Sequence, residues 1–355
     1  MAVQIGTHDL ASLRENRFQS VADFSETILN EIIQADIAAH NAVVQEMESD
    51  LVAATTDRQR IYGVSVEGEF QEVDEFSRVP TQMYQGGSTV GFPLRLYSYA
   101  TGWTARTLAK MSVGEAAEMV LGAQQANVRR RRQAIKQALY LSSNYTARDT
   151  LDVPVIDLAV KRLLNADGMA IPNAPDASPF NAASHTHYSG VASLSATALA
   201  ALIQNVTEHG HGGRVVVAIN YVDAATVSAL TGFVPATQQG VLAATSSATT
   251  VMGTNAANQY NRFLGMFNAA EVWIKPWAVA NYAVCYDAVA REKPLVRRVD
   301  RIAQFVGMRL VAEHTVHPLS TAHYEDSFGY AVWGRSSAAV LQFNNATYTD
   351  PVVGA

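Results

Sequence analysis

The sequence is poor in charge and in cysteine. Asp, Glu, Lys and Arg make up 16 % of the 355 residues, against about 25 % in a typical soluble domain. Because charged residues are depleted at the cores of protein interfaces, this shortage predicts that other subunits cover part of the surface. The 48 % hydrophobic content excludes intrinsic disorder. One cysteine, Cys285, excludes an intrachain disulfide framework, and its apolar neighbours favour a buried thiol.

Motifs of common enzyme classes are missing too. The sequence holds no GxxxxGK[ST] phosphate loop, GxGxxG turn, GxSxG elbow or HExxH pair, so catalysis has no support in it. The opening MAVQIGTHDL lacks the basic and apolar segments of a secretory signal. The longest apolar runs, such as Val215–Ile219, are far shorter than the ~20 residues that span a bilayer. We expect a soluble protein made in a cytosol, with no membrane partner.

Acidic residues are concentrated towards the N-terminus. Residues 1–75 hold 15 Asp or Glu against 4 Arg, a formal charge of −11, while the remainder carries +5. The net charge of −6 argues against a protein that coats nucleic acid, which would be basic. The asymmetry favours either segments that meet across copies of the chain or a solvated acidic arm.

The first half of the chain predicts a helix followed by a hairpin. Apolar residues recur at three- and four-residue spacing over residues 23–52, the pattern of an amphipathic helix. Over residues 61–100, apolar and polar residues alternate in YGVSVEGEF and again in STVGFPLRLYSYATGW, which predicts a long β-hairpin with a broad tip. Because two strands alone are marginally stable in water, this hairpin needs another surface to lie on.

A second, longer helix is predicted over residues 112–141. Ser112 and Glu115 form an S-x-x-E capping box, and helical periodicity continues to Leu141. Four consecutive arginines, Arg129–Arg132, lie within it and fan around the cylinder, so no single face takes them all. They favour either a solvated, salt-bridged helix or contact with an acidic neighbour or with nucleic acid phosphate.

The second half of the chain mixes helix and strand without strict alternation. Residues 165–195 and 235–260 predict long loops. A helix over 195–208 and the strand RVVVAI lie between them, and later strands are predicted in EVWIKPW, YAVCYD, PLVRRV, VGMRLVAEHTV, FGYAVWG and AAVLQF. This order predicts an α+β fold.

Histidines are the only candidates for metal chemistry. His185 and His187 stand two residues apart, as do His209 and His211, and neutral imidazoles bind metals. No Asp, Glu or Cys is expected to complete a site with them from helical spacing. We therefore expect loop histidines that make hydrogen bonds or lie at an interface, with no metal or cofactor. Three further carboxylates look like ordinary caps and turns without a partner base: Asp149, Asp152 and Asp157.

The order and lengths of these elements resemble the major capsid protein of tailed bacteriophages, which has the Hong Kong 97-like fold. The resemblance implies an N-terminal arm with an amphipathic helix over residues 1–60 and an extended hairpin, the E-loop, over 61–100. It implies a P-domain over 101–194 with the spine helix at 112–141, an A-domain over 195–300, and C-terminal strands over 301–355 that return to the P-domain and A-domain.

The resemblance also implies a function. The chain would be a self-assembling structural protein, not an enzyme, whose pentamers and hexamers form the icosahedral capsid of a virion. The capsid would enclose double-stranded DNA without sequence-specific binding and assemble in the host bacterial cytoplasm with a portal. Some members carry a cross-linking lysine in the E-loop or a scaffolding segment that a protease removes. Residues 61–100 hold no lysine and the chain begins at Met1, so we expect non-covalent contacts or a cement protein, and a separate scaffolding protein.

Two alternatives stay open. An encapsulin, the shell of a bacterial cargo compartment, has the same fold, although the long arm before the hairpin favours the phage protein. A rival of another class is a metal-dependent enzyme that uses the loop histidines.

For a shell protein, the functional residues would be contacts between subunits. We expect hairpin carboxylates to pair with arginines of a neighbour, and the helix arginines to face other subunits or the lumen. The candidates are Glu67, Glu69, Glu72, Asp74 and Glu75 on the hairpin, Arg129, Arg130, Arg131 and Arg132 on the long helix, and Arg297, Arg298 and Arg301 farther along the chain.

Overall fold

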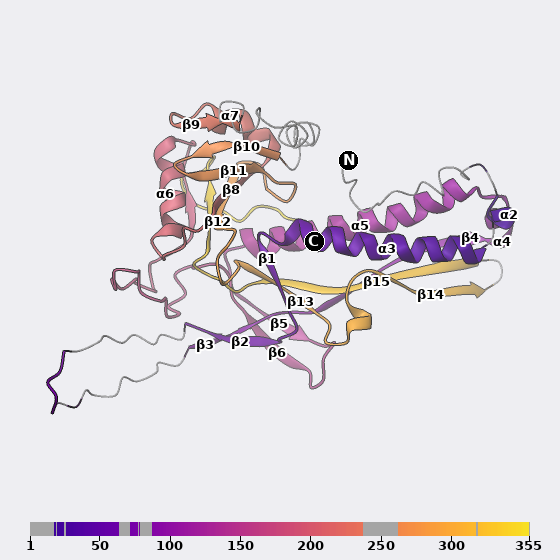
Figure 1. The fold of residues 1–355 in the computed structure, drawn as a ribbon, viewed down its shortest axis with the longest axis horizontal. Helices are drawn as coiled ribbons and strands as arrows, with labels where there is room; N and C mark the ends of the chain where they lie inside the picture. The colour runs from indigo at the N-terminus through magenta and orange to yellow at the C-terminus, as the bar shows by residue number, and fades with distance from the viewer. Residues whose placement is uncertain are drawn as a thin grey trace.

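Two long helices lie side by side along one half of the molecule (Figure 1). They are α3 (Glu26–Glu48) and α5 (Val113–Tyr140), and the short helices α2 (Val21–Phe24) and α4 (Ala105–Lys110) lie at their far end. Ser112 caps α5 as predicted, since its side chain accepts the Glu115 N–H while the Glu115 carboxylate accepts the Ser112 N–H. This capping box satisfies donors that a helix start otherwise leaves unpaired.

The computed structural model describes residues 18, 20–24, 26–63, 72–76, 78, 87–236, 262–316 and 319–354. Within these ranges, the long helices are too polar to cross a membrane. Helices and strands are both abundant, so the predicted mixture of α and β structure is confirmed.

A seven-stranded sheet forms the other end of the molecule, at the upper left of Figure 1. Its strands, in spatial order, are β7 (Tyr188–Gly190), β16 (Ala338–Gln342), β12 (Tyr282–Asp287), β8 (Val215–Ile219), β11 (Ala270–Ile274), β10 (Arg262–Phe267) and β9 (Phe233–Pro235). Helix α6 (Ala196–Thr207) packs on β12 and β16. The 3₁₀ turn η1 (Tyr221–Asp223) leads into α7 (Ala224–Ser228), which packs on β9 and β10.

Both faces of this sheet are buried at its centre. Every residue of β12 and β16 is buried. Successive strand residues point to opposite faces, so Val217 and Cys285 join the core beneath α6 while Val216 and Val284 join the core that includes Tyr140 of α5. Two-sided burial explains the continuous apolar runs of these strands. The predicted burial of Cys285 is confirmed, and that burial raises the pKa of its thiol.

A five-stranded sheet lies against α5. Its long strand β15 (Leu319–Val332) pairs antiparallel with β13 (Leu295–Val299), β14 (Arg309–Val316) and β4 (Arg95–Thr104), and β1 (Val52–Thr55) joins β13 in parallel. The 3₁₀ turn η3 (Ala303–Phe305) lies between β13 and β14. Because α5 contacts both β15 and β4, this half of the molecule is a helix layer on a sheet.

The predicted hairpin over residues 61–100 is only partly correct. β2 (Gln59–Tyr62) pairs antiparallel with β3 (Ser88–Gly91), as expected. The following strand, β4, was assigned to the same hairpin but pairs with β15. Pro93 stands at the crossing from one sheet to the other, where a residue without an N–H interrupts no ladder. The two sides of this crossing differ in burial: Phe92 is fully buried, whereas Leu96 of β4 is 47 % exposed.

Most other predicted elements are present. The helix over 195–208 is α6, capped by Ser195, and the late strands appear as β11 to β16, with β15 longer than FGYAVWG indicated. The hairpin of β5 (Tyr145–Asp149) and β6 (Ile156–Val160) was not predicted, because its strands expose one face and lack a long apolar run. The second predicted loop lies mostly outside the described residues.

Candidate functional site

The four arginines of α5 occupy different environments, as their helical fan predicted. Arg129 is exposed, Arg130 and Arg132 are half-buried, and Arg131 is buried. The guanidinium of Arg130 lies 4.8 Å from the centre of the Tyr97 ring and donates a hydrogen bond to Gln133 at 2.9 Å. The arginine run therefore divides into outward and inward members.

Arg131 joins α5 to β15 and α3 inside the chain. Its Nη2 lies 2.6 Å from Oδ2 of buried Asp326, and its guanidinium sits 4.6 Å from the centre of the Phe328 ring. Glu48, the last residue of α3, accepts a 2.5 Å hydrogen bond from the Tyr330 hydroxyl and lies 3.9 Å from Arg131 Nη1. Burial lowers the pKa of Arg131, but Tyr330, Asp326 and Glu48 outweigh it, so the pKa is raised and the side chain stays charged.

Arg297 and Arg298 of β13 also point into the chain. Arg298 is fully buried and binds Asp149 Oδ2 at 2.8 Å, the Phe92 carbonyl at 2.8 Å, and Asp152. Arg297 lies 3.3 Å from Glu48. Asp152 lies in the turn between β5 and β6, as predicted, but Asp149 is a strand residue and not a cap. Both carboxylates bind Arg298 and so anchor the β5–β6 hairpin to β13.

The remaining arginine near β13 faces outwards. The side chain of Arg301 is 59 % exposed, and its Nε lies 3.9 Å from Asp152. Contact with another subunit stays a prediction for all the arginines singled out from the sequence. Among them, Arg129 and Arg301 are exposed, and Arg130 and Arg132 are half-buried. In contrast, Arg131, Arg297 and Arg298 already bind carboxylates of their own chain.

The hairpin carboxylates fall into two groups. Glu67 and Glu69 lie outside the described residues. Glu72, Asp74 and Glu75 belong to a short described segment, residues 72–76, which Figure 1 shows apart from the body of the molecule. We call residues 72–76 the acidic tip. All five are exposed, and two are apolar: Val73 is 48 % exposed and Phe76 is 92 % exposed.

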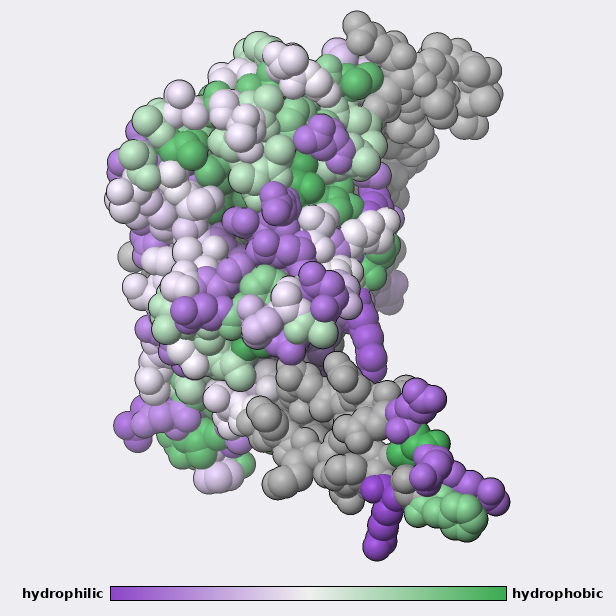
Figure 2. Space-filling view, turned by 90° about the vertical axis from the view of Figure 1, so that its left-hand side faces the viewer, coloured by the Kyte–Doolittle hydropathy of each residue, from purple (hydrophilic) through white to green (hydrophobic). Residues whose placement is uncertain are grey.

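A groove runs beside α5 on the body of the molecule. Its volume is about 520 Å³, and its lining mixes cationic and aromatic side chains. Arg95 and Arg130 line it together with Tyr97 and Tyr145. A surface of this composition favours acidic and aromatic groups, because arginine binds carboxylates and stacks on rings. Figure 2 faces another side of the molecule, the end where α6 lies, and shows a belt of hydrophilic residues between the upper and lower parts of that side.

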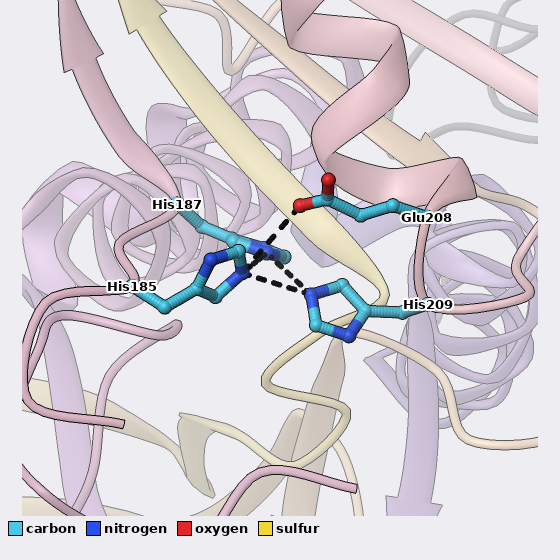
Figure 3. A group of neighbouring side chains, drawn as sticks. All are labelled: His185, His187, Glu208 and His209. Atoms are coloured by element: carbon cyan, nitrogen blue, oxygen red, sulfur yellow. Dashed lines mark hydrogen bonds and ion pairs between the residues drawn. The ribbon is translucent and has the colours of Figure 1, made fainter. Parts of the chain in front are cut away.

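The loop histidines form the most compact group of metal-ligating side chains among the described residues. His185 and His187 lie at the end of the long loop before β7, and His209 follows α6. Their Nε2 atoms are separated by 3.0 Å (His185 to His209), 3.1 Å (His187 to His209) and 3.3 Å (His185 to His187). Figure 3 shows the three rings pointing towards one another.

Glu208 completes this group. It is the C-cap residue of α6, and its Oε1 lies 3.6 Å from His185 Nε2. One ligand atom from each of the four residues lies within 4.8 Å of the other three. The expectation that no carboxylate completes the histidine group is therefore wrong, because the carboxylate comes from the residue beside His209 and not from helical spacing. His211 is not a member; its Nε2 lies 3.1 Å from Ser336 Oγ.

The local chain holds the histidines in place. His187 is fully buried, and its Nδ1 lies 2.6 Å from the Ala338 carbonyl of β16. Phe180 covers the other two rings, with its centre 4.1 Å from that of His209 and 4.8 Å from that of His185. Gly210, at φ +82°, turns the chain after α6 in a conformation that glycine adopts without strain.

Burial keeps these imidazoles neutral. It lowers the pKa of His185, holds that of His187 well below its usual range, and lowers that of His209 to about 3 with help from His185 and His211. Neutral imidazole is the form of histidine that binds metal ions.

No family model and no curated protein matches the sequence. Solved structures do match. A chain from "Mycobacterium phage Patience" aligns with a TM-score of 0.66 and 18 % identity, over 92 % of this chain and 90 % of that one. A chain from "Capsid of native GTA particle" aligns with a TM-score of 0.48 and 13 % identity, over 86 % of this chain and 91 % of that one. A chain from the SrpI encapsulin complex of Synechococcus elongatus aligns with a TM-score of 0.44 and 11 % identity, over 87 % of this chain and 90 % of that one.

The solved structures that match this chain include phage capsid proteins, in agreement with the resemblance inferred from the order of its elements. At 18 % identity the property that the match establishes is the fold. This chain therefore has a phage capsid-shell fold.

Proposed function

We propose that this chain is the major capsid protein of a tailed bacteriophage and assembles into pentamers and hexamers of an icosahedral shell around double-stranded DNA. The observation that carries the proposal is the match to the Mycobacterium phage Patience chain, with a TM-score of 0.66 over 92 % of this chain. A match over nearly the whole length of both chains supports a shared architecture, and a shared architecture supports a shared role only by analogy.

The domain division of such a subunit fits the two halves of the molecule. The helix α3 with β1 would belong to the arm of residues 1–60, and β2 and β3 would form the base of the E-loop over 61–100. The P-domain, 101–194, would hold α5 and the β5–β6 hairpin, and the A-domain, 195–300, would hold most of the seven-stranded sheet. Residues 301–355 supply β16 to that sheet and β15 to the other, which supports their assignment as returning strands.

The acidic tip would be a contact between subunits. A phenylalanine that is 92 % exposed beside three exposed acidic residues is unfavourable in water, and apolar side chains of this kind mark interaction sites. Its complement is a surface that offers both cations and rings. The groove lined by Arg95, Arg130 and Tyr97 has that composition, and Arg129 and Arg301 are further exposed cations. We propose that the acidic tip of one subunit binds such cations on its neighbour.

Electron microscopy of the purified chain tests the function directly. We expect shells or capsomers hundreds of Å across in negative stain, alone or with a co-expressed scaffolding protein. Compact monomers under both conditions would contradict the proposal. Shells that hold protein cargo in place of DNA would favour the encapsulin alternative, and a phage lysate would show whether a portal and a cement protein accompany the chain.

Charge reversal tests the contact. In the triple variant E72K/D74K/E75K, we expect the yield of assembled particles to fall at least tenfold while the melting temperature of the unassembled chain stays unchanged, because the three side chains are exposed. Combining it with R129E/R130E/R301E should restore part of the yield, since opposite charges again face one another. Normal yield from the acidic-tip variant alone would exclude this contact.

The control for that experiment is a charge reversal away from these surfaces. Arg291 is exposed in the turn between β12 and β13, so R291E should change neither stability nor yield. Charge reversal at Arg131 is unsuitable, because the loss of its buried ion pair would unfold the chain and lower the yield for another reason.

A further inference from the structure

The triangle of histidine nitrogens cannot be satisfied by hydrogen bonds alone. Each Nε2 either carries a hydrogen or presents a lone pair. Because there are three nitrogens and only these two states, at least two of the nitrogens must be in the same state, whatever the tautomers and protonation of the rings. All three contacts are 3.0–3.3 Å long. At least one contact therefore brings two lone pairs or two hydrogens together, which is repulsive.

His187 makes this conflict sharper. Its Nδ1 lies 2.6 Å from the Ala338 carbonyl, which only accepts hydrogen bonds, so Nδ1 carries the hydrogen of the neutral ring. Its Nε2 is then a lone pair that points at the other two rings. A carbonyl that holds one histidine nitrogen while the other faces a shared centre is the usual outer-shell arrangement of a metal ligand.

The spacing of the ligand atoms matches a tetrahedral metal. Zinc–nitrogen bonds are about 2.0–2.1 Å long, so two nitrogens on one tetrahedral zinc lie about 3.3 Å apart. The three Nε2 distances, 3.0, 3.1 and 3.3 Å, are close to this value. Glu208 Oε1 lies 3.6 Å from His185 Nε2, and the four ligand atoms lie within 4.8 Å of one another, so the carboxylate is in reach of the fourth corner (Figure 3). A cation among the four would accept every lone pair and remove the repulsion.

We propose that His185, His187, His209 and Glu208 bind one Zn²⁺ ion. Three imidazoles and a carboxylate suit zinc better than calcium or magnesium, which prefer oxygen ligands. With four protein ligands the site is closed, as structural zinc sites are. The ion joins the end of the long loop over 165–187 to the C-terminus of α6, and the Ala338 contact connects both to β16.

The position of the four ligands, between the long loop and the end of α6, indicates what the ion would do. The long loop has little regular structure of its own, so its ordering has to come from contacts with its neighbours. A zinc ion that closes this loop onto α6 would supply part of its binding free energy to folding. This inference does not rest on the proposed capsid function, since it follows from four side chains within one subunit.

Metal analysis of the purified full-length chain tests the site. After chelation and dialysis, titration with Zn²⁺ should load about one ion per chain and raise the melting temperature by several degrees, because a ligand that binds only the folded state stabilises it. Co²⁺ in place of Zn²⁺ should give the strong visible absorption of a tetrahedral ion. A chain that takes up no Zn²⁺, or takes it up without any change in melting temperature, would overturn the proposal.

Variants separate this site from adventitious binding. H209Q and E208Q should each weaken Zn²⁺ binding at least tenfold and lose most of the rise in melting temperature. H211Q is the matched control, because His211 lies two residues from His209 but faces Ser336. Equal Zn²⁺ binding by H209Q and H211Q would assign the ion to another place and refute the site. The metal-free variants should still fold, since only the increment supplied by zinc is removed.

Discussion

The two sheets of this molecule differ in how much buried charge holds them to their neighbours. The seven-stranded sheet packs apolar and aromatic side chains on both faces, against α6 on one side and the end of α5 on the other. The five-stranded sheet also packs apolar side chains against α5 and the β5–β6 hairpin, but it adds buried ion pairs, Arg131 with Asp326 and Arg298 with Asp149. Apolar packing is tolerant of small shifts, whereas a buried ion pair requires one geometry and is costly when half of it is lost.

The largest effect is expected at the buried ion pair between α5 and the five-stranded sheet. R131M keeps a long side chain but leaves Asp326 buried without its cation, and removal of one partner of a buried pair costs about 3–5 kcal/mol. R129M is the matched control on the same helix; it changes an exposed residue and should stay within about 0.5 kcal/mol of the parent. Urea unfolding of both variants measures the difference. Equal stability of the two would mean that Arg131 is solvated in the subunit.

The next largest loss of stability is expected from a cavity between α6 and the seven-stranded sheet. Leu199 of α6 is fully buried against the seven-stranded sheet, so L199A should lose about 2–5 kcal/mol. Its deficit should be the same at pH 7 and pH 5, because no charge is involved. Unfolding curves at the two pH values measure this, and a deficit that changes between them would contradict a purely apolar loss at Leu199.

The smallest effect concerns a carboxylate within the apolar half. Asp223 is 5 % exposed and accepts a hydrogen bond from the Asn281 N–H, and its burial raises its pKa to about 6. The folded state then binds the proton more tightly than the unfolded state, whose pKa is about 3.9. This residue's contribution to stability is present below pH 4 and is lost as the pH rises to about 6.

The variant D223N removes that titration. Its melting temperature, relative to the parent, should therefore rise between pH 4 and pH 6 and stay level above. A difference that is constant over this interval would show that Asp223 titrates normally in the folded chain.

Local sequence signals predicted the elements that depend on neighbouring residues. The capping box placed the start of α5 at the right residue, and apolar runs such as YAVCYD marked strands buried on both sides. β4 was assigned to the wrong partner, because alternation shows that a residue stretch is a strand but not which strand it joins.

The candidate site residues show the same difference between what local sequence predicts and what depends on distant partners. Four adjacent arginines look alike in sequence, and their helical fan predicted that they differ in direction without indicating which one is buried. The histidine pairs were visible, but Glu208 was not predicted to join them. Its local signals are its position beside His209 and its place three residues before His211. The convergence of residues from two loops depends on how α6 packs on β16, which is a long-range contact.

By itself, the sequence determined the low charge, the acidic N-terminal region, the two long helices and most of the strands, because these depend on composition and on periodicity within one segment. The tertiary structure alone decided which arginines are buried, which strand β4 joins, and that three histidines and a glutamate meet within 4.8 Å. Each of these facts depends on contacts between residues more than 20 positions apart in the chain or on the partner strand in a sheet. A pattern within one segment does not specify such contacts.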